Sequence, residues 1–561
     1  MRIGSAELRG VESLCLGAAV GLISLPTSAF ALGQALLLAG HRITALPAVV
    51  ILALSLATST ALAWRTARSL IAPAVLLVVV MLATVLSAIV FDTSYDGQFY
   101  HFDAITALAQ GWNPFLSPQP EPDIVQIVGP IDIWARHYPQ GAWIFSALQV
   151  AAGAPSEATK GLALIALGAL FLAVWGTASG FGLGPVASTV VSASAAVNPI
   201  LLVQLFSRMN DGLLAACLAL VATFSIWWIL RPRWWAVVGV VCPLVLAVNL
   251  KFSAVPMAVG LCGLICLYAL VLRGWRAMLA VAGALALAGT VGVVILGAHP
   301  YVTNTLRHGH PFYPLMGQGK VDIIANTQPL AFEGLSAPQR MLFSYFGATE
   351  VGLAGGERLK PPFAVYRSEL LPIGQYDARI AAFGPLYSGA LVLGVMLAAA
   401  ALAQRPLPAP VRRLVLGALG ILALALVMPQ AWWARYVPYA WWIPVLVALA
   451  ATVSRPRALR FGGMALFAVL LVNGLLVAGS SAVAIGRRNL HIRHQHAEIA
   501  RQTEPVCLYV GAMHARLALW DDLPGTVRLR TRPLQGCALI PLAGANPDTS
   551  PGYCLCDEVR P

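Results

Sequence analysis

The sequence predicts an all-α polytopic membrane protein of about 13 transmembrane helices, with a small α/β or β-rich domain at its C-terminal end. Of the 561 residues, 59% are hydrophobic and 11% are charged, against about a quarter charged in an ordinary soluble protein. The mean hydropathy is +0.77, and apolar runs of roughly 20 residues recur along the chain. These observations exclude a soluble enzyme, a disordered chain and a short-period repeat protein.

About thirteen apolar runs, bounded by charged residues or by Pro and Gly, are predicted to span the membrane. One further run, 140–153, is too short to cross comfortably, and counting it would move every later arginine cluster to the other side. We therefore interpret it as an interfacial or re-entrant helix. The first run is too long for a signal peptide cleaved after SAFA (28–31), so an uncleaved helix is expected. The predicted spans are 11–39, 45–64, 69–90, 160–179, 185–206, 211–230, 235–250, 254–272, 277–298, 385–404, 413–429, 437–453 and 461–485.

The positions of the arginines predict the orientation of these spans. Short arginine runs between apolar segments are typical of cytoplasmic loops, and with a cytoplasmic N-terminus all of them fall on that side. They account for the formal net charge of +13, so no nucleic-acid partner is expected. An odd number of spans places the C-terminus outside, which in a bacterial inner (cytoplasmic) membrane is the periplasm. The arginines are Arg2, Arg9, Arg65, Arg68, Arg231, Arg233, Arg273, Arg276, Arg405, Arg412, Arg413, Arg455, Arg457 and Arg460.

Three polar, Pro- and Gly-rich segments are expected to share the external face: 91–159, 299–384 and 486–561. The chain therefore divides into a transmembrane domain, 1–485, which carries the first two segments as loops, and a small external C-terminal domain, 486–561. The runs PVCLYVG from 505 and VRLRTR from 527 are typical of strands. We expect the chemistry of the protein at this face.

Four of the nine cysteines gather in the C-terminal segment, which favours two disulfides in an oxidising compartment. Three connectivities of Cys507, Cys537, Cys554 and Cys556 are possible, and a four-cysteine zinc site is the alternative. The spacing lacks paired C-x-x-C knuckles, so disulfides are favoured. The nearby HIRHQH run, 491–496, has metal-ligand residues, but a solvated helix that leaves the membrane explains it better.

Charged residues of both signs lie at the external ends of the predicted spans. Ionisable groups at the edge of the hydrocarbon usually face a cavity, pair with one another or bind a polar substrate. The simpler interpretations are helix N-caps or solvated loop acids for the aspartates, and an interfacial arginine beside Trp432 and Trp433 for Arg435. The first group is Asp92, Asp96, His101 and Asp103, and the second is Arg208, Asp211, Lys251, Arg307 and Arg435.

A cavity that holds both carboxylates and cations suits a substrate with hydroxyls at one end and a phosphate at the other. A carboxylate can take the proton of an attacking hydroxyl, while Lys and Arg neutralise the charge on a departing phosphate. Asp211 has two predicted roles: it binds sugar hydroxyls, or it pairs with Arg208 or Lys251. The pattern favours glycosyl transfer from a lipid phosphate.

Several motifs in residues 90–450 resemble the GT-C fold integral-membrane glycosyltransferases that use polyprenyl-phosphate-linked sugars, as the dolichyl-phosphate-mannose, aminoarabinose and arabinofuranosyl transferases do. The motifs are Asp96 followed by Tyr100, His101 and a G-x-N-P turn (Gly111, Asn113, Pro114), the NDG of Asn210, Asp211 and Gly212, Lys251, a PY-x-x-N…G-x-P-x-x-PL segment (Pro300, Tyr301, Asn304, Gly309, Pro311, Pro314, Leu315) and the late WWARYVP.

The resemblance implies that Asp96 is the catalytic base, with Asp92 and Asp103 as alternatives. It implies that neither a metal nor another cofactor is needed, and that substrate is bound by Asp92, His101, Asp103, Asp211, Lys251, Arg307 and Arg435. The partners would be a polyprenyl-phosphate sugar donor, a lipid or polysaccharide acceptor and membrane lipids. Two features depart from the family pattern: two extra spans precede the acidic loop, and Tyr-Asp-Gly (95–97) replaces the adjacent acids.

Three other functions fit the composition. A flippase or transporter of lipid-linked sugars shares the apolar bundle but is expected to show repeats or broken helices near the midplane. An O-antigen ligase or polymerase depends on arginines and a large external loop. A structural membrane subunit needs no site. The sequence leaves the sugar, the acceptor and the oligomeric state open.

Overall fold

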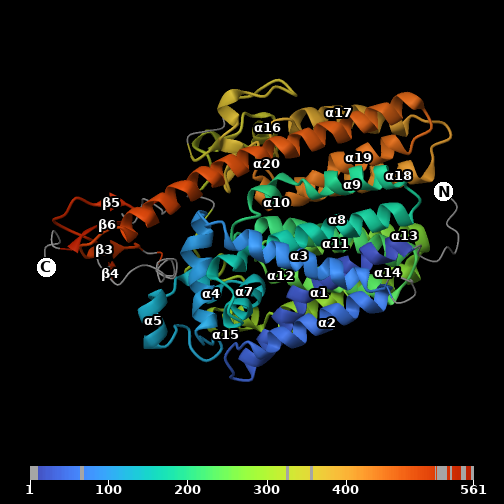
Figure 1. Ribbon diagram of the computed structural model, residues 1–561. Helices are drawn as coiled ribbons and strands as arrows, with labels where there is room; N and C mark the ends of the chain where they lie inside the picture. The colour runs from blue at the N-terminus through green and yellow to red at the C-terminus, as the bar shows by residue number, and fades with distance from the viewer. Residues whose placement is uncertain are drawn as a thin grey trace.

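The computed structural model describes residues 10–63, 69–323, 327–353, 358–511, 513, 527–530, 533–544 and 551–556. Figure 1 shows a bundle of long helices with the two long loops and a small sheet gathered toward one end, away from the turns that join α13 to α14 and α17 to α18. Four of the arginines predicted to be cytoplasmic, Arg2, Arg9, Arg65 and Arg68, lie outside the described residues.

Within the described ranges, eight helices are long and apolar enough to cross a membrane, so the protein is a polytopic membrane protein. They are α1 (Gly10–Leu38), α3 (Ile71–Ala88), α8 (Leu162–Gly180, preceded by the 3₁₀ turn η2, Ser156–Gly161), α11 (Asp211–Leu230), α13 (Ala254–Arg273), α14 (Trp275–Thr290, continued by the π-helical turn η3, Val291–Ile295), α18 (Ala409–Leu426) and α20 (Arg457–Ala500).

The other five predicted spans also form helices, but shorter apolar ones, so thirteen crossings stay a prediction. The predicted span 185–206 is interrupted because Asn198 caps α10, accepting from the backbone N–H of Ile200 at 3.1 Å, and Pro199 occupies the first turn. These helices are α2 (Leu46–Ala63), α9 (Pro185–Ala196) with α10 (Pro199–Val203), α12 (Trp234–Val248), α17 (Tyr387–Leu402) and α19 (Trp442–Thr452, preceded by η9, Pro438–Trp441).

The bundle has an inner and an outer layer. Most of α1 and α11 is buried by neighbouring helices, whereas less than a third of α3, α13, α14 and α18 is buried. Exposed leucines and valines on those outer helices, such as Leu82 and Val271, are expected where lipid is the solvent. The outer helices therefore form the lipid-facing surface.

The first long loop folds into short helices around α7 (Gly141–Ala151), the run predicted to be interfacial or re-entrant. Most of α7 is buried, and it packs against α1 and α4. A π-helical turn, η1 (Gly97–His101), leads into α4. The other helices of this loop are α4 (Phe102–Ala109), α5 (Pro122–Val128) and α6 (Ile133–His137).

The second long loop is mostly irregular and contains a two-stranded antiparallel sheet of β1 (Glu350–Val351) and β2 (Ala378–Ile380), with a register shift between them. Helix α16 precedes this sheet, and the loop begins with the π-helical turn η4 and α15. Their bounds are η4 (Ala298–Val302), α15 (Thr303–His308), the 3₁₀ turn η5 (Leu330–Phe332), α16 (Ala337–Phe346), and the 3₁₀ turns η6 (Arg367–Glu369) and η7 (Pro372–Gly374).

The last helix, α20, continues without a break past residue 485, where the transmembrane domain was predicted to end. It has 44 residues, which corresponds to about 66 Å at 1.5 Å per residue, against about 30 Å for a bilayer core. Its distal part extends beyond the bundle toward the C-terminal sheet (Figure 1). The HIRHQH run lies on this helix, in agreement with the helix predicted for it.

The chain ends in a four-stranded sheet with the order β4-β3-β6-β5. The pair β3 and β4 is parallel, and the other two pairs are antiparallel. Ile499 of α20 packs against the buried face of the sheet with Val506 and Leu508, which ties the sheet to the helix. The strands are β3 (Val506–Tyr509), β4 (Val527–Leu529), β5 (Ile540–Pro541) and β6 (Gly552–Leu555), so both predicted strand runs are confirmed.

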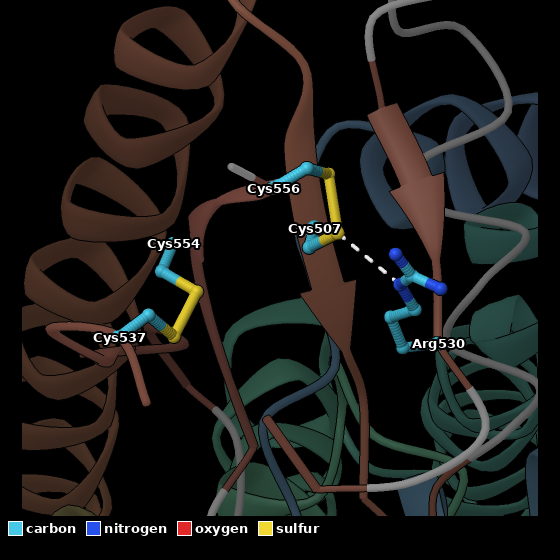
Figure 2. Close-up of a disulfide and its surroundings, with 5 residues drawn as sticks. All are labelled: Cys507, Arg530, Cys537, Cys554 and Cys556. Atoms are coloured by element: carbon cyan, nitrogen blue, oxygen red, sulfur yellow. Dashed lines mark hydrogen bonds between the residues drawn. A yellow bond between two sulfur atoms is a disulfide. The ribbon is translucent and has the colours of Figure 1, made fainter. Parts of the chain in front are cut away.

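Two disulfides join the sheet, as the cysteine count predicted. Cys507 bonds to Cys556, and Cys537 bonds to Cys554 (Figure 2). Cys507 and Cys554 lie opposite each other on β3 and β6, where directly opposite side chains share a face, yet each bonds to another cysteine. Arg530 donates from Nε to Sγ of Cys507 at 3.2 Å. Of the three possible connectivities, this one joins the residue just after β6 to β3 and joins β6 itself to the segment that contains Cys537.

Candidate functional site

A single arginine, Arg435, binds three aspartates at the end of the bundle where the long loops lie. It belongs to the 3₁₀ turn η8 (Ala434–Tyr436), between α18 and α19. Its Nε donates to Oδ2 of Asp211 at 2.8 Å, its Nη1 to Oδ1 of Asp377 at 2.9 Å and its Nη2 to Oδ2 of Asp96 at 3.1 Å. All three guanidinium nitrogens therefore make charge-assisted hydrogen bonds, the strongest kind between side chains.

The three carboxylates come from distant parts of the chain. Asp96 immediately precedes η1 in the first long loop, and Asp211 is the first residue of α11. Asp377 immediately precedes β2 in the second long loop. The cluster thus joins both long loops to the ends of membrane-spanning helices, and it forms only when the tertiary fold is complete.

Asp211 is the buried anchor of the cluster. Its side chain is 1% exposed, and its Oδ1 lies 2.6 Å from Nζ of Lys251, the residue that follows the end of α12 by three positions. Gln204 donates to Oδ2 at 3.2 Å. Of the partners predicted for Asp211, the structure gives Lys251. Its amine also lies 4.4 Å from the ring centroid of Tyr436, a cation–π contact.

Exposure increases from the anchor to the loops. The side chain of Arg435 is 13% exposed, that of Asp96 is 25% exposed and that of Asp377 is 36% exposed. The guanidinium also lies 5.2 Å from the ring of Trp433, so it packs on one of the tryptophans of the WWARYVP run. Asp96 and Asp377 are therefore the members of the cluster that a ligand from solution meets first.

The charges of the cluster balance. A third cation, Arg379 of β2, places Nη2 at 3.6 Å from Oδ2 of Asp377. Three carboxylates therefore face Arg379, Arg435 and Lys251, and the formal net charge of the cluster is zero. An anionic ligand that binds Arg435 must displace one of the carboxylates that now hold it.

Asp377 is the carboxylate most easily displaced. Burial raises the pKa of its carboxyl above the usual value, Arg435 opposes the rise, and the neighbouring Asp96 carboxylate adds to it. The charged form is thus less favoured at Asp377 than in an ordinary exposed aspartate. Its position on an irregular loop also lets it move without disturbing a membrane-spanning helix.

His101 is buried in the turn that follows Asp96, next to the Arg435 cluster. Its ring is buried in η1, and Nε1 of Trp143 donates to Nδ1 of His101 at 2.6 Å, so the neutral ring carries its proton on Nε2. Burial lowers its pKa to about 4. The neutral imidazole stacks near the Tyr100 ring, at 4.3 Å between centroids, and supports the turn that follows Asp96.

Asp92 belongs to a second, fully buried network. Its Oδ2 accepts from the backbone N–H of Arg208 at 2.8 Å, and its Oδ1 accepts from the backbone N–H of Ser94 at 2.9 Å. The Arg208 guanidinium lies 3.4 Å from Asp92 and 3.5 Å from Glu157, which also pairs with Lys160. The side chains of Asp92 and Arg208 are 0% and 2% exposed, so these charges hold the loop and do not face solution.

The two remaining predicted residues are Asp103 and Arg307. Asp103 is buried in the first turn of α4. Arg307 is exposed on α15, and its Nη2 donates to the carbonyl of Phe115 at 3.4 Å. No ion pair in the described part of the chain joins Arg307 to the Arg435 cluster, so the structure does not bring it together with Lys251 and Arg435.

Two glycines explain the Asp-Gly sequences of the site. A Cβ at Gly97 would overlap the carboxylate of Asp92, so the residue after Asp96 has no room for the second acid of the family pattern. A Cβ at Gly212 would lie 2.8 Å from the Cα of Leu201, where α11 meets α10. In both places, glycine lets the backbone that carries an aspartate approach its neighbour closely.

Sequence reasoning missed Asp377 and Arg379. Both residues lie in the second long loop, whose charged residues are indistinguishable by sequence pattern. Glu369, for example, is equally isolated in the sequence, yet it is buried against Lys360 at 2.6 Å. The two acids differ only in the folded structure, where Asp377 immediately precedes β2 and contacts Arg379 and Arg435.

The described residues contain no group of three His, Cys, Asp or Glu side chains arranged to hold a metal ion. In the HIRHQH run, His494 lies 3.4 Å from Glu498 on an exposed face of α20. The chain matches no protein-family model, and no curated protein matches it. Its function is therefore inferred from the contacts around Arg435.

Proposed function

We propose that the protein is an inverting glycosyltransferase that moves a sugar from a polyprenyl-phosphate donor to an envelope acceptor. The Arg435 cluster carries this proposal: a guanidinium and an amine, next to partly exposed carboxylates, at one end of an apolar helical bundle. A lipid phosphate needs the cations, and a sugar acceptor needs a base. The apolar surface of the helical bundle can contact the lipid tail.

The proposal includes the topology of the GT-C glycosyltransferases that the sequence resembles. Thirteen crossings with a cytoplasmic N-terminus place the cluster, both long loops and the sheet at the external face of a bacterial inner membrane. The arginine-rich turns then face the cytoplasm. A flippase is expected to carry its ionisable groups near the midplane, whereas these are gathered at one end.

In this proposal Arg435 and Lys251 hold the donor phosphate, and Asp211 fixes both cations. Asp211 contacts Arg435 at 2.8 Å and Lys251 at 2.6 Å, and its burial keeps it in place when the Asp377 carboxylate leaves. A preorganised donor of this kind contributes about 3 to 4 kcal/mol to transition-state stabilisation.

Asp96 is proposed to take the proton of the acceptor hydroxyl. The acceptor oxygen attacks the anomeric carbon while the bond from that carbon to the phosphate oxygen breaks, and the electron pair leaves with the polyprenyl phosphate. Arg435 and Lys251 neutralise the charge that develops there. One displacement from the face opposite the phosphate inverts the anomeric configuration, through an oxocarbenium-like transition state.

Binding of the donor requires that Asp377 leave Arg435. The second long loop then acts as a lid. In the structure the Asp377 carboxylate accepts a hydrogen bond from Nη1 of Arg435, and it moves away when the donor phosphate binds. Asp96 stays beside the site because η1 and His101 hold its backbone. This exchange keeps the charge on the buried arginine compensated at every stage.

The test is transfer of label from radiolabelled polyprenyl-phosphate sugars to crude envelope acceptor by purified protein in nanodiscs. We expect Asp96→Asn to lower the rate by about 10² to 10⁴ while donor binding is retained, because the carboxylate acts as base in the transition state. The matched control is Asp123→Asn, an exposed aspartate of the same loop, for which the rate should stay within about twofold of wild type.

Equal transfer by wild type and Asp96→Asn would exclude Asp96 as the base. Tight binding of lipid-linked sugar without transfer from any donor would contradict the enzyme and favour a flippase.

A further inference from the structure

The arginines at the opposite end of the bundle have no acidic residues near them in the sequence. No Asp or Glu occurs between Asp377 and Glu498, a stretch that contains α17, α18, α19 and most of α20. Arg455, Arg457 and Arg460 lie at the turn from α19 to α20 and are exposed. In the described part of the chain, none of the three forms an ion pair, so a positive surface remains at this turn.

A cavity of about 350 Å³ opens beside these arginines. Thr452 at the end of α19, together with Arg457, Arg460, Phe461 and Met464 of α20, lines it. Its volume falls within the range of about 300 to 1,000 Å³ that is typical of small-molecule sites. The cavity therefore combines cations at one edge with an apolar wall.

The spacing along α20 arranges the two kinds of side chain on one face. Phe461 lies four residues after Arg457, and Met464 lies four residues after Arg460, so each apolar side chain is one helical turn beyond an arginine. Phe461 is 66% exposed and Met464 is 51% exposed. This order, with cations at the helix end and apolar surface toward the middle of the span, matches the order of headgroup and acyl chain in a phospholipid.

We propose that this cavity binds an anionic phospholipid. Arg457 and Arg460 hold the phosphate, which guanidinium groups bind by paired hydrogen bonds, and an acyl chain lies along Phe461 and Met464. Basic pockets between membrane helices bind anionic headgroups in this way. The site is distinct from the Arg435 cluster, because α19 and α20 place the two at opposite ends of the bundle, and it does not depend on the proposed enzymatic activity.

The experiment measures phosphatidylglycerol retained by the purified full chain, by native mass spectrometry during release from nanodiscs. Nanodiscs of phosphatidylcholine alone serve as the zwitterionic comparison. We expect retention of phosphatidylglycerol in preference to phosphatidylcholine, and about 30-fold weaker retention in the Arg457→Gln/Arg460→Gln double variant. Phe461→Ser should weaken retention with the arginines intact, which separates a lipid site from a site for phosphate alone.

The chain offers a matched control in Arg273→Gln/Arg276→Gln. These arginines have the same spacing of three residues at a turn of the same end of the bundle, and they do not line the cavity. An equal loss of phosphatidylglycerol retention in the control would show that the effect comes from general surface charge, and it would overturn the proposal. Displacement of phosphatidylglycerol by soluble glycerol phosphate at matched concentration would also overturn it, since the acyl chain would then contribute nothing. Gel filtration of each variant identifies any variant that fails to fold. If Arg457→Gln/Arg460→Gln fails to fold, Arg457→Lys/Arg460→Lys, which keeps the charge but not the paired hydrogen bonds, replaces it.

Discussion

Aspartates only a few residues apart have different physical environments in the first long loop. Asp92 is fully buried, and each of its oxygens accepts hydrogen bonds from the loop or from Arg208. Asp96, four residues later, is 25% exposed and contacts a cation at the edge of the site. A buried, fully paired carboxylate costs several kcal/mol to disturb, whereas an exposed one exchanges partners readily. At the scale of single residues, burial separates the structural acid Asp92 from Asp96, the proposed base.

Asp377 gives the sharpest test at this scale. We expect Asp377→Asn to bind the polyprenyl-phosphate donor about fivefold more tightly at pH 7.5, because the competing charge at Arg435 is gone; the gain is about 1 kcal/mol for a partly exposed pair. Donor affinity is measured by titration of the labelled donor into protein in nanodiscs.

The raised pKa of Asp377 also gives the sign of the pH dependence. As the pH falls through this pKa, the wild-type carboxyl becomes neutral and releases Arg435, so wild-type affinity should rise to meet that of the variant. Above the pKa of Asp377, wild type should continue to bind the donor less tightly than Asp377→Asn does. A difference in donor affinity between wild type and Asp377→Asn that is the same at every pH, or that becomes larger in acid, would contradict the proposal that Asp377 competes with the donor for Arg435.

At the scale of elements, α20 connects the membrane bundle to the loop that carries Asp96. Oδ1 of Asn489 accepts from the backbone N–H of Phe91 at 2.6 Å, and its Nδ2 donates to the Phe91 carbonyl at 3.4 Å. The C-terminal segment adds a further contact, since Nε2 of Gln98 donates to the carbonyl of Gly544 at 2.9 Å. The loop is therefore held on both sides of Asp96 by parts of the chain that follow the bundle.

Replacement of Asn489 by alanine should loosen this loop. Loss of a buried hydrogen-bonding side chain is expected to lower the free energy of unfolding by about 1 to 3 kcal/mol, because the Phe91 backbone loses its partner. Transfer activity should fall by about tenfold, since Asp96 is less well positioned. Thermal unfolding in detergent and the transfer assay measure the two effects. The control is His494→Ala on the same helix, whose side chain is 73% exposed; equal losses in both variants would contradict a role for Asn489.

Helices were the most predictable elements. The predicted span 211–230 coincides with α11 (Asp211–Leu230), and 254–272 ends one residue before α13 does. The last span was predicted to end at 485 because hydropathy detects the membrane and not the helix. Residues 487–500 are polar but contain neither Pro nor Gly, so α20 continues, in agreement with the helix predicted for the HIRHQH run.

The site was only partly predictable for a related reason. Sidedness placed Asp96, Asp211, Lys251 and Arg435 at one end of the bundle, and the structure joins these four residues in one cluster. The contacts of Asp377 and the burial of Asp92 depend on pairings between distant segments. No local pattern encodes such pairings.

At the scale of the whole molecule, the number of crossings determines where the two ends lie. Eight crossings would place both ends on the same side, and thirteen would place them on opposite sides. We expect a C-terminal alkaline phosphatase fusion to be active and a C-terminal green fluorescent protein fusion to be dark in bacterial cells, with the reverse for reporters in the turn between α13 and α14. A fluorescent C-terminal fusion would contradict the external position of the sheet and of the Arg435 cluster.

The contact between Phe91 and Asn489 joins residues 398 positions apart in the chain. At about 5 to 20 residues per second, a ribosome needs roughly 20 to 80 s to make the intervening segment. During that interval the early helices are already in the membrane, while the loop that carries Asp96 still lacks its partner. A nascent chain of this protein therefore completes this support of its candidate site only near the end of synthesis, so a fragment released early from the ribosome lacks it whatever number of helices it has inserted.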